Sequence, residues 1–143
     1  MTFAEALLAL TLNLFFEARG EGVRGMGAVA DVTITRVHDK RYPSNVQDVV
    51  LQSRQFSWTR QHLKGRKDFF GMVALQNELL HSGKMRPADL KRYKEAEAIA
   101  HKVLREGYKP RYRFTHFHTI KIRPYWVEYR SGMQIGNHIF YRF

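Results

Sequence analysis

The sequence of 143 residues contains no cysteine, which excludes a disulfide framework and any zinc or cluster site with thiolate ligands. A fold without cysteine is compatible with the cytosol, the periplasm and the extracellular space, so this absence does not select a compartment. A hydrophobic content of 44% and an aromatic content of 13% exclude a disordered chain. We therefore expect one domain with its own core over residues 1–143.

Signals for export and for membrane insertion are also missing. The longest apolar stretch, Ala6 to Phe16, has no lysine or arginine before it and leads directly into Glu17. It is about eleven residues long, whereas a transmembrane helix needs about 20, and a signal peptide begins with a positive segment. We expect a chain that is made in the cytoplasm without a signal peptide and that has no transmembrane segment.

Acidic residues are few compared with basic ones. Asp and Glu total 13 against 24 Lys and Arg, which gives a formal net charge of +11 and a pI near 10.2. So large an excess predicts attraction to a polyanion. Charge alone does not choose between nucleic acid, anionic lipid and an acidic cell-wall polymer.

Hydrophobic periodicity predicts that the first two thirds of the chain are helical. Thr2 and Glu5 have the spacing of a capping box for a buried helix from Phe3 to Ala18, with Gly20 as its stop. Apolar residues at spacings of three and four predict further helices over residues 23–37, 46–51, 71–81 and 87–104.

Weaker local signals fill the segments between these helices. Ser44 and Gln47 have the spacing of a second capping box, which predicts the start of the short helix over residues 46–51. Residues 55–58 are predicted to form a loop, and the basic, polar segment from Thr59 to Lys67 is predicted to be exposed.

From Arg111 onward the hydrophobic period changes to two. This pattern predicts a strand over residues 112–119, a second over 125–129, a turn at 131–132 and a last strand over 138–143. Helices followed by a small antiparallel sheet in the C-terminal third indicate an α+β fold.

Glu17 is the candidate catalytic residue with the clearest chemical rationale. Burial beside Phe15 and Phe16 and the negative end of the helix dipole both disfavour ionisation of its carboxyl group. A carboxylic acid that stays partly protonated near neutral pH can donate a proton to a leaving group. From this stretch alone, a solvated glutamate paired with Arg19 is the alternative.

Histidines gather in the predicted sheet. His116 and His118 are two residues apart and share a face of a strand, and with His138 they suggest a metal site. Because no acidic or histidine partner stands at a typical zinc spacing, we predict no metal and no cofactor. Basic and aromatic residues alternate between Arg111 and Arg123, which suits either a solvated sheet face or binding of single-stranded nucleic acid.

Several motifs follow one another along the chain. They are Phe16-Glu17-Ala18-Arg19-Gly20-Glu21, Gly25 with Ala28-Val29-Ala30 and Val32, Arg36-Val37, Tyr42-Pro43, Gln55-Phe56-Ser57-Trp58, Thr115-His116-Phe117-His118, Trp126 and Gly136-Asn137-His138-Ile139-Phe140-Tyr141. In this order they resemble the signature of the SleB-type cell-wall hydrolases, which include spore-cortex-lytic enzymes and phage lysins. Two positions depart from it: Thr35 replaces the usual Asn, and Phe117 replaces a common Tyr.

The resemblance implies a lysozyme-like fold, in which a glycan groove separates a mainly helical lobe from a small β lobe. It implies that peptidoglycan is the partner and that Glu17 is the catalytic acid. Of the three sheet histidines, His138 is the one that we expect to matter most. The candidate substrate-binding residues are Glu21, Phe56, Trp58, His116, His118, Trp126, His138 and Tyr141. Each aromatic residue among them is equally compatible with a place in the core.

The chemistry implied by the resemblance is that of a lytic transglycosylase, which needs one carboxylate and forms a 1,6-anhydromuramoyl end. Hydrolytic glycosidases usually need two, separated by about 5–5.5 or 6.5–9.5 Å. Glu21 is the only nearby second candidate, and we expect it to be structural or to orient the substrate. The alternatives are a hydrolytic muramidase and a basic nucleic-acid-binding module without catalysis.

The missing export signal and the basic charge together suggest a phage endolysin. We expect it to reach the cell wall from the host cytoplasm once the membrane is opened, and to be held there by anionic envelope polymers. We expect a monomer with no specific nucleic-acid partner.

Overall fold

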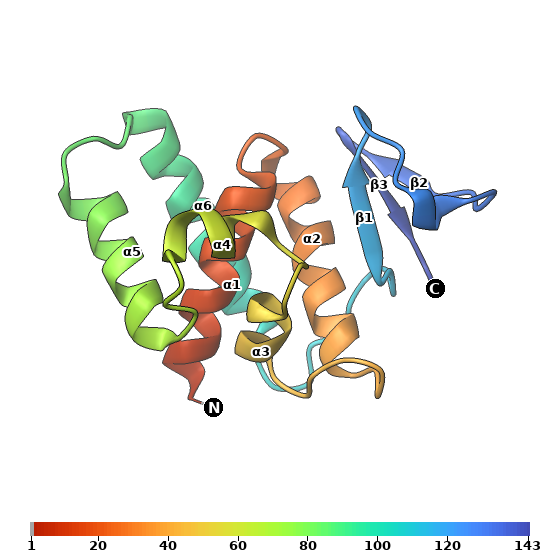
Figure 1. Cartoon of the computed structure of the whole chain (residues 1–143), viewed down its shortest axis with the longest axis horizontal. Helices are drawn as coiled ribbons and strands as arrows, with labels where there is room; N and C mark the ends of the chain where they lie inside the picture. Colours follow the sequence, from red (N-terminus) through yellow and green to blue (C-terminus); the bar gives the residue numbers. More distant parts are fainter. Residues whose placement is uncertain (1) are drawn as a thin grey trace.

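The structure, a computed structural model, describes residues 2–143 and consists of a helical lobe and a small β lobe (Figure 1). The elements of the helical lobe are α1 (Phe3–Ala18), α2 (Gly22–Val37), α3 (Val46–Leu51), α4 (Ser57–Leu63), α5 (Phe69–His81) and α6 (Pro87–Val103). Those of the β lobe are β1 (His116–Thr119), the 3₁₀ helix η1 (Tyr125–Val127), β2 (Met133–Ile135) and β3 (His138–Tyr141). The predicted α+β class is confirmed.

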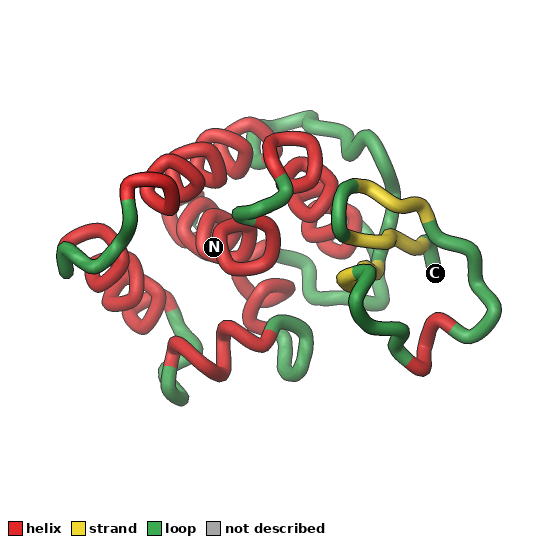
Figure 2. The backbone as a smooth tube through the Cα atoms, turned by 90° about the horizontal axis from the view of Figure 1, so that it is seen from above, coloured by secondary structure: helices red, strands yellow, loops and turns green. Residues whose placement is uncertain are grey.

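Helix α1 is the central element of the helical lobe. It packs against α2, α3, α5 and α6, and Figure 2 shows the helices gathered together with the sheet set to one side. The predicted N-cap is present, since the Thr2 hydroxyl accepts from the Glu5 amide at 3.1 Å, while the Glu5 side chain accepts from the Thr2 hydroxyl and not from its backbone amide. Because α1 is buried along most of its length, its last turn carries Glu17 from the core to the boundary between the lobes.

The other long helices match their predicted ranges closely, and α3 differs only in its cap. The predicted Ser44–Gln47 box is wrong. Asn45 is the N-cap, and its side-chain oxygen accepts from the Asp48 amide at 2.9 Å while its amide group donates to the Asp48 carboxylate at 2.8 Å. The reciprocal bond between Asn45 and Asp48 satisfies the first turn one residue later than predicted.

The predicted loop and exposed segment between residues 55 and 67 are wrong for α4. Trp58, Thr59 and Leu63 are buried on the inner side of this helix, and the Thr59 hydroxyl donates to the Phe56 carbonyl at 2.8 Å. Polar and basic residues between these positions hide the helical period in the sequence. The helix ends at Lys64, whose φ of 52° is left-handed.

The β lobe is a three-stranded antiparallel sheet with the order β1-β3-β2. The register pairs His116 with Tyr141 and Thr119 with His138. Only the last four residues of the strand predicted over 112–119 are in β1, whereas the last predicted strand contains β3. The partner of β3 on its other side, β2, was not predicted and is joined to it through Gly136 and Asn137.

The predicted strand over residues 125–129 is wrong, because Tyr125 to Val127 form η1. Pro124 precedes this turn, and Glu128 follows it with a φ of 51°. Tyr125 and Tyr129 are 92% and 100% exposed. The period of two suggested a strand, but only Val127 is buried, so no alternating apolar face exists for a sheet to cover.

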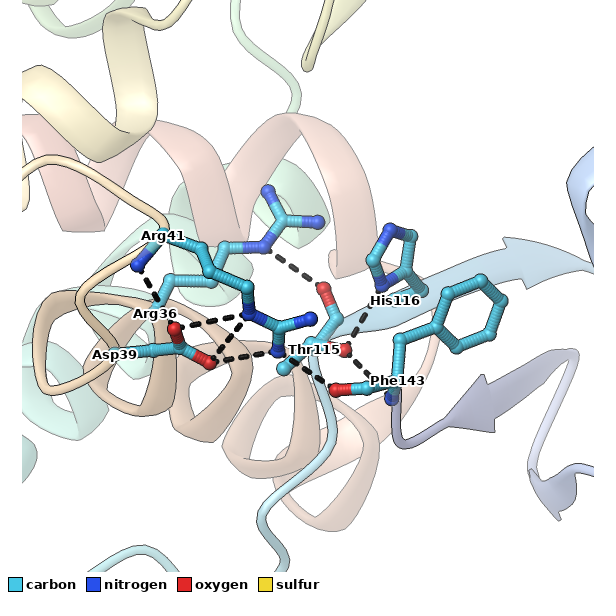
Figure 3. A network of polar contacts seen from close by, with 6 residues as sticks. All are labelled: Arg36, Asp39, Arg41, Thr115, His116 and Phe143. Carbon is cyan, nitrogen blue, oxygen red and sulfur yellow. Dashed lines mark hydrogen bonds and ion pairs between the residues drawn. The ribbon is translucent and has the colours of Figure 1, made fainter.

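Arginine side chains join the two lobes (Figure 3). Buried Arg36 of α2 donates to the Thr115 carbonyl at 2.8 Å and to the Gln55 side chain at 2.9 Å. Arg41 donates to the Phe143 carbonyl at 2.7 Å. These bonds hold the start of β1 and the end of the chain against the helical lobe. None of the helices within residues 2–143 is both long and apolar enough to cross a membrane.

Candidate active site

Two adjoining cavities meet at Glu17, on the boundary between the lobes. Their volumes are about 330 Å³ and 840 Å³, and both are lined by Phe16, Glu17, Thr119 and His138. We call them together the interlobe groove. Its helical wall is formed by the end of α1 and the start of α4, and its other wall by the sheet and η1.

The electrostatics of the groove favour a protonated Glu17. Burial raises the pKa of its carboxyl group to about 7. Within residues 2–143, no side chain donates a hydrogen bond to this carboxyl group or forms an ion pair with it, so its desolvation is not offset. At neutral pH the group therefore exists in both protonation states. A group that acts first as a general acid and then as a base needs both of them.

This raised pKa predicts a measurable pH dependence of stability. The folded pKa of Glu17 is about 7 against an ordinary value of 4.5, so the folded protein binds the proton more tightly than the unfolded chain. Ionisation of Glu17 therefore lowers the free energy of unfolding progressively as the pH rises from about 4.5 to 7. Above pH 7 the loss is about 3 kcal/mol, at about 1.4 kcal/mol per pKa unit.

Glu17→Gln removes this charge without changing the shape of the side chain. We expect the free energy of unfolding of the variant to equal that of the wild type near pH 4 and to exceed it by about 3 kcal/mol at pH 8. Urea unfolding of both proteins across this pH range measures the difference. A difference that does not change with pH would contradict an elevated Glu17 pKa.

Glu21, the other carboxylate of the groove, connects the lobes. Its Oε1 accepts from the Asn137 backbone amide at 2.7 Å, and its Oε2 accepts from the Asn137 side chain at 3.1 Å. His138 Nδ1 lies 3.2 Å from Glu21 Oε1, although not at the angle of a hydrogen bond. The Glu21 side chain is only 9% exposed. We call this contact of Glu21 with Asn137 and His138 the lobe clasp.

The lobe clasp also explains a local backbone feature. Gly136 has a φ of +60°, and a Cβ at this position would lie 3.0 Å from Glu21 Oε1. Glycine therefore permits both the turn between β2 and β3 and the close approach of the carboxylate. With both of its oxygens engaged, Glu21 has the geometry of a positioning residue.

The sheet histidines are separated by the two faces of the sheet. His118 and His116 lie on the face that carries Tyr141 and Trp126, whereas His138 lies on the opposite face against Phe117. Within residues 2–143, no group of three or more His, Cys, Asp or Glu side chains is arranged to hold a metal ion. The sheet therefore does not bring these histidines together as one ligand set.

The surroundings of each histidine limit its chemistry. Burial, followed by the charges of Arg36, Arg41 and Arg130, lowers the pKa of His116 to about 4, so this ring is neutral at pH 7. Burial also lowers the pKa of His138, against the opposing effect of Glu21. All three histidines line the interlobe groove, but His138 alone lines both of its cavities.

His118 lies between two fixed partners. Its Nδ1 lies 2.7 Å from the Thr119 carbonyl, which can only accept, so Nδ1 is the donor. Its Nε2 lies 2.9 Å from the Tyr141 hydroxyl. Tyr141 is 3% exposed and does not line the groove. It supports the groove by holding His118 and by packing against Trp126, with ring centroids 5.6 Å apart.

Trp58 occupies the core. It is 2% exposed, its indole N–H donates to Asn13 Oδ1 at 2.8 Å, and its ring stacks on Phe16 at 5.3 Å. A sugar face has no access to it in this structure. The structure therefore places Trp58 in the core, and not on the wall of the groove where a substrate could contact it.

We expect Trp58→Phe to lower the free energy of unfolding by about 2 kcal/mol, because buried Asn13 loses the indole donor. The KM for glycan should stay within about twofold of the wild type, since a core residue supports binding only indirectly. Urea unfolding and steady-state kinetics measure the two effects. A large increase in KM with unchanged stability would instead place Trp58 at the substrate.

The other aromatic candidates are closer to the groove. Phe56 is only 5% exposed but lines the larger cavity, and half-buried Trp126 lines it beside exposed Tyr125. Substrate contact by Phe56 and Trp126 stays a prediction. Tyr125 was not among the sequence candidates, although it stands next to Trp126, which was one of them.

Two further groove residues, Arg36 and Phe117, were visible in the motifs but had no assigned role. Arg36 supplies the buried cation of the wall, and its pKa is lowered by burial. Phe117 stands where the resemblance leads one to expect Tyr, and it packs against His138 with ring centroids 5.2 Å apart. The wall at this point offers a ring without a hydroxyl group.

A partly protonated carboxylic acid in a groove between a helical and a β lobe has the features of an active site for acid–base catalysis. The model of a cell wall hydrolase family matches residues 20–141, so the chain belongs to this family and acts on peptidoglycan. The matched range begins just after Glu17. The role of Glu17 therefore rests on the groove and on the motif that contains it.

Two solved structures have the same fold. The catalytic domain of the germination-specific lytic transglycosylase SleB from Bacillus anthracis is 21% identical, with a TM-score of 0.60 and coverage of 99% of this chain and 97% of that one. The catalytic domain of the Bacillus cereus SleB protein is 20% identical, with a TM-score of 0.63 and coverage of 99% and 93%. No curated protein matches the chain.

Proposed function

We propose that the enzyme cleaves the glycan strand of peptidoglycan between N-acetylmuramic acid and N-acetylglucosamine as a lytic transglycosylase. One observation carries this proposal. Within residues 2–143, Glu17 and Glu21 are the carboxyl groups that line the interlobe groove, and only Glu17 has oxygens that no other side chain or amide engages. A reaction that needs a single carboxyl group suits this site better than one that needs two.

The reaction uses the two protonation states of Glu17 in turn. The protonated carboxyl group donates its proton to the bridging oxygen, which leaves with the N-acetylglucosamine side as the glycosidic bond breaks. The resulting carboxylate accepts the proton of the muramoyl 6-hydroxyl. The oxygen of this hydroxyl bonds to the anomeric carbon and closes a 1,6-anhydro ring, so Glu17 ends protonated and no water is consumed.

Glu17 is suited to this exchange by its surroundings. A pKa of about 7 means that proton donation and proton acceptance are both accessible near neutral pH. Phe16 and Phe117 line the groove and keep the carboxyl group in an apolar setting. Tyr125 and Trp126 offer ring faces for sugar on the opposite wall.

Mass spectrometry of peptidoglycan digests tests the proposal. The wild type should release fragments that are lighter by one water than hydrolytic products, and Glu17→Gln should release none. Fragments with ordinary reducing ends would show a hydrolytic muramidase on the same fold. Absence of cleavage by the wild type would overturn the proposal and favour the basic nucleic-acid-binding alternative.

We further propose that the enzyme works as a phage endolysin, made in the host cytoplasm and released onto the wall. The formal charge of +11 supports attachment to anionic envelope polymers. Lysis of the host from within, lost with Glu17→Gln, would be the matching cellular result.

Attachment by charge predicts that salt weakens activity on whole walls. We expect the rate of wall cleavage to fall about tenfold between about 0.05 M and 0.5 M salt, because screening shortens the reach of the basic surface. Turbidity of wall suspensions measures this rate. Walls stripped of their phosphate polymers are the control and should show a weaker dependence. Equal rates at all salt concentrations would contradict attachment by charge.

A further inference from the structure

A third cavity lies on the boundary between the lobes, outside the interlobe groove. Its volume is about 670 Å³, and it lies between the end of α2, the segment that follows α6 and the last residues of the chain. We call it the basic pocket, because Lys109, Arg113 and Arg142 line it. Neither the family match nor the proposed reaction gives it a role.

The basic pocket has an excess of unused positive charge. Within residues 2–143, Lys109, Arg113 and Arg142 form no ion pair and donate no side-chain hydrogen bond. The one side-chain carboxylate in its lining, Asp39, is already engaged by Arg41 at 2.7 Å, and hydrogen bonds from Arg41 lower the pKa of Asp39 to about 2. Arg41 also engages the carboxyl-terminal residue Phe143, at 2.7 Å. Three uncompensated cations around one cavity suit an oxyanion.

The rim of the basic pocket is held in place from the core. Buried Asp31 of α2 accepts from the Tyr108 hydroxyl at 2.6 Å and from the Arg111 amide at 2.8 Å. These bonds fix the segment that presents Lys109 and Pro110 to the pocket. The cations therefore project from an ordered backbone.

The lining is mixed rather than purely charged. Half-buried Tyr108, Pro110 and Phe143 contribute apolar surface beside the cations. A bare inorganic ion would use only the cations, whereas a short peptide with a terminal or side-chain carboxylate would use both kinds of surface. The volume is also in the range of sites for molecules of this size, about 300–1,000 Å³.

The basic pocket adjoins the interlobe groove. Thr35 and Thr115 line the pocket, and the next residue in each case, Arg36 and His116, lines the groove. Arg36 bonds to the Thr115 carbonyl at 2.8 Å, so this contact forms the partition between the two (Figure 3). Both residues are buried, so a peptide that starts in the groove reaches the pocket around the outer edge of this layer.

We infer that the basic pocket binds the carboxylates of the peptide stem attached to the muramic acid that lies in the groove. This inference rests on the proposed function, because it takes a glycan strand in the groove as its starting point. The stem is the substrate part that combines carboxylates, apolar side chains and attachment to the muramic acid at the site of cleavage. The pocket then selects strands that carry stems.

The kinetic test uses Arg113→Gln combined with Arg142→Gln, and two substrates: strands that carry stems, and the same strands freed of stems by an amidase. We expect kcat/KM of the double variant to fall about tenfold on stem-bearing strands and to change less than twofold on stripped strands. Lys91→Gln combined with Lys94→Gln, at two exposed positions of α6, is the matched control for charge. Equal losses on both substrates, or no loss on either, would overturn the inference.

A binding test separates this inference from the proposed function. A synthetic stem peptide of L-alanine, γ-linked D-glutamate and diaminopimelate is titrated into wild type and double variant by calorimetry, with inorganic phosphate as a second titrant. Binding of the peptide by the wild type alone supports the stem site even where no glycan is cleaved. Equal binding by both proteins, or binding of phosphate in preference to the peptide, overturns it.

Discussion

Glu17→Gln should lower the rate of glycan cleavage by about 10² to 10⁴-fold, the usual contribution of a general acid–base residue. The amide matches the carboxyl group in shape but can neither give up a proton to the bridging oxygen nor accept one from the muramoyl hydroxyl. Because desolvation of the carboxylate is what raises the pKa of Glu17, the loss of activity should accompany higher stability at alkaline pH. Release of soluble fragments from purified peptidoglycan measures the rate.

The matched control is Glu97→Gln, at an exposed position on α6. It removes the same charge from the protein and should leave the cleavage rate within about twofold of the wild type. Near-normal activity of Glu17→Gln would contradict the assignment of the catalytic acid, however well the variant folds.

Glu21→Ala should lower the free energy of unfolding by about 2–4 kcal/mol, because the lobe clasp loses two hydrogen bonds to a charged, nearly buried acceptor. Activity should fall with it, since the clasp holds the sheet against the end of α1. The chemistry should not change: the fragments that remain should have the same ends as those of the wild type. Urea unfolding and product masses give the two readouts.

A double-mutant cycle with Asn137→Ala isolates the side-chain part of the lobe clasp. We expect a coupling free energy of about 1 kcal/mol between Glu21 and Asn137, with the remainder of the Glu21 effect assigned to the Asn137 backbone amide. A Glu21→Ala protein with wild-type stability and no activity would contradict the clasp. That result would give Glu21 a direct role in catalysis.

Elements with strong local signals could be predicted from the sequence. Helix α1 combines the spacing of a capping box, a continuous apolar run and a terminal glycine, and the structure has it at the predicted residues. Helix α4 was not predicted, because its buried positions are separated by polar residues that hide the helical period. The short strand β2 depends on pairing with β3, which is not a local property.

The candidate site also combines features that could be predicted from the sequence with features that could not. The raised pKa of Glu17 follows from an apolar neighbourhood that is contiguous in sequence, so it could be anticipated from the residues around it. The partners of Glu21 and Trp58 come from positions 116 and 45 residues away, respectively. Only the packed structure shows that one residue connects the lobes and the other fills the core.

The most direct test of the central claim, a single working carboxyl group that forms an anhydro end, is digestion of peptidoglycan in water enriched in the heavy oxygen isotope. If the muramoyl 6-hydroxyl is the nucleophile, the newly formed ends contain no oxygen from the solvent, and we predict fragments without label from the wild type. Incorporation of one heavy oxygen at each new reducing end would show that water attacks, and it would contradict the mechanism proposed for Glu17.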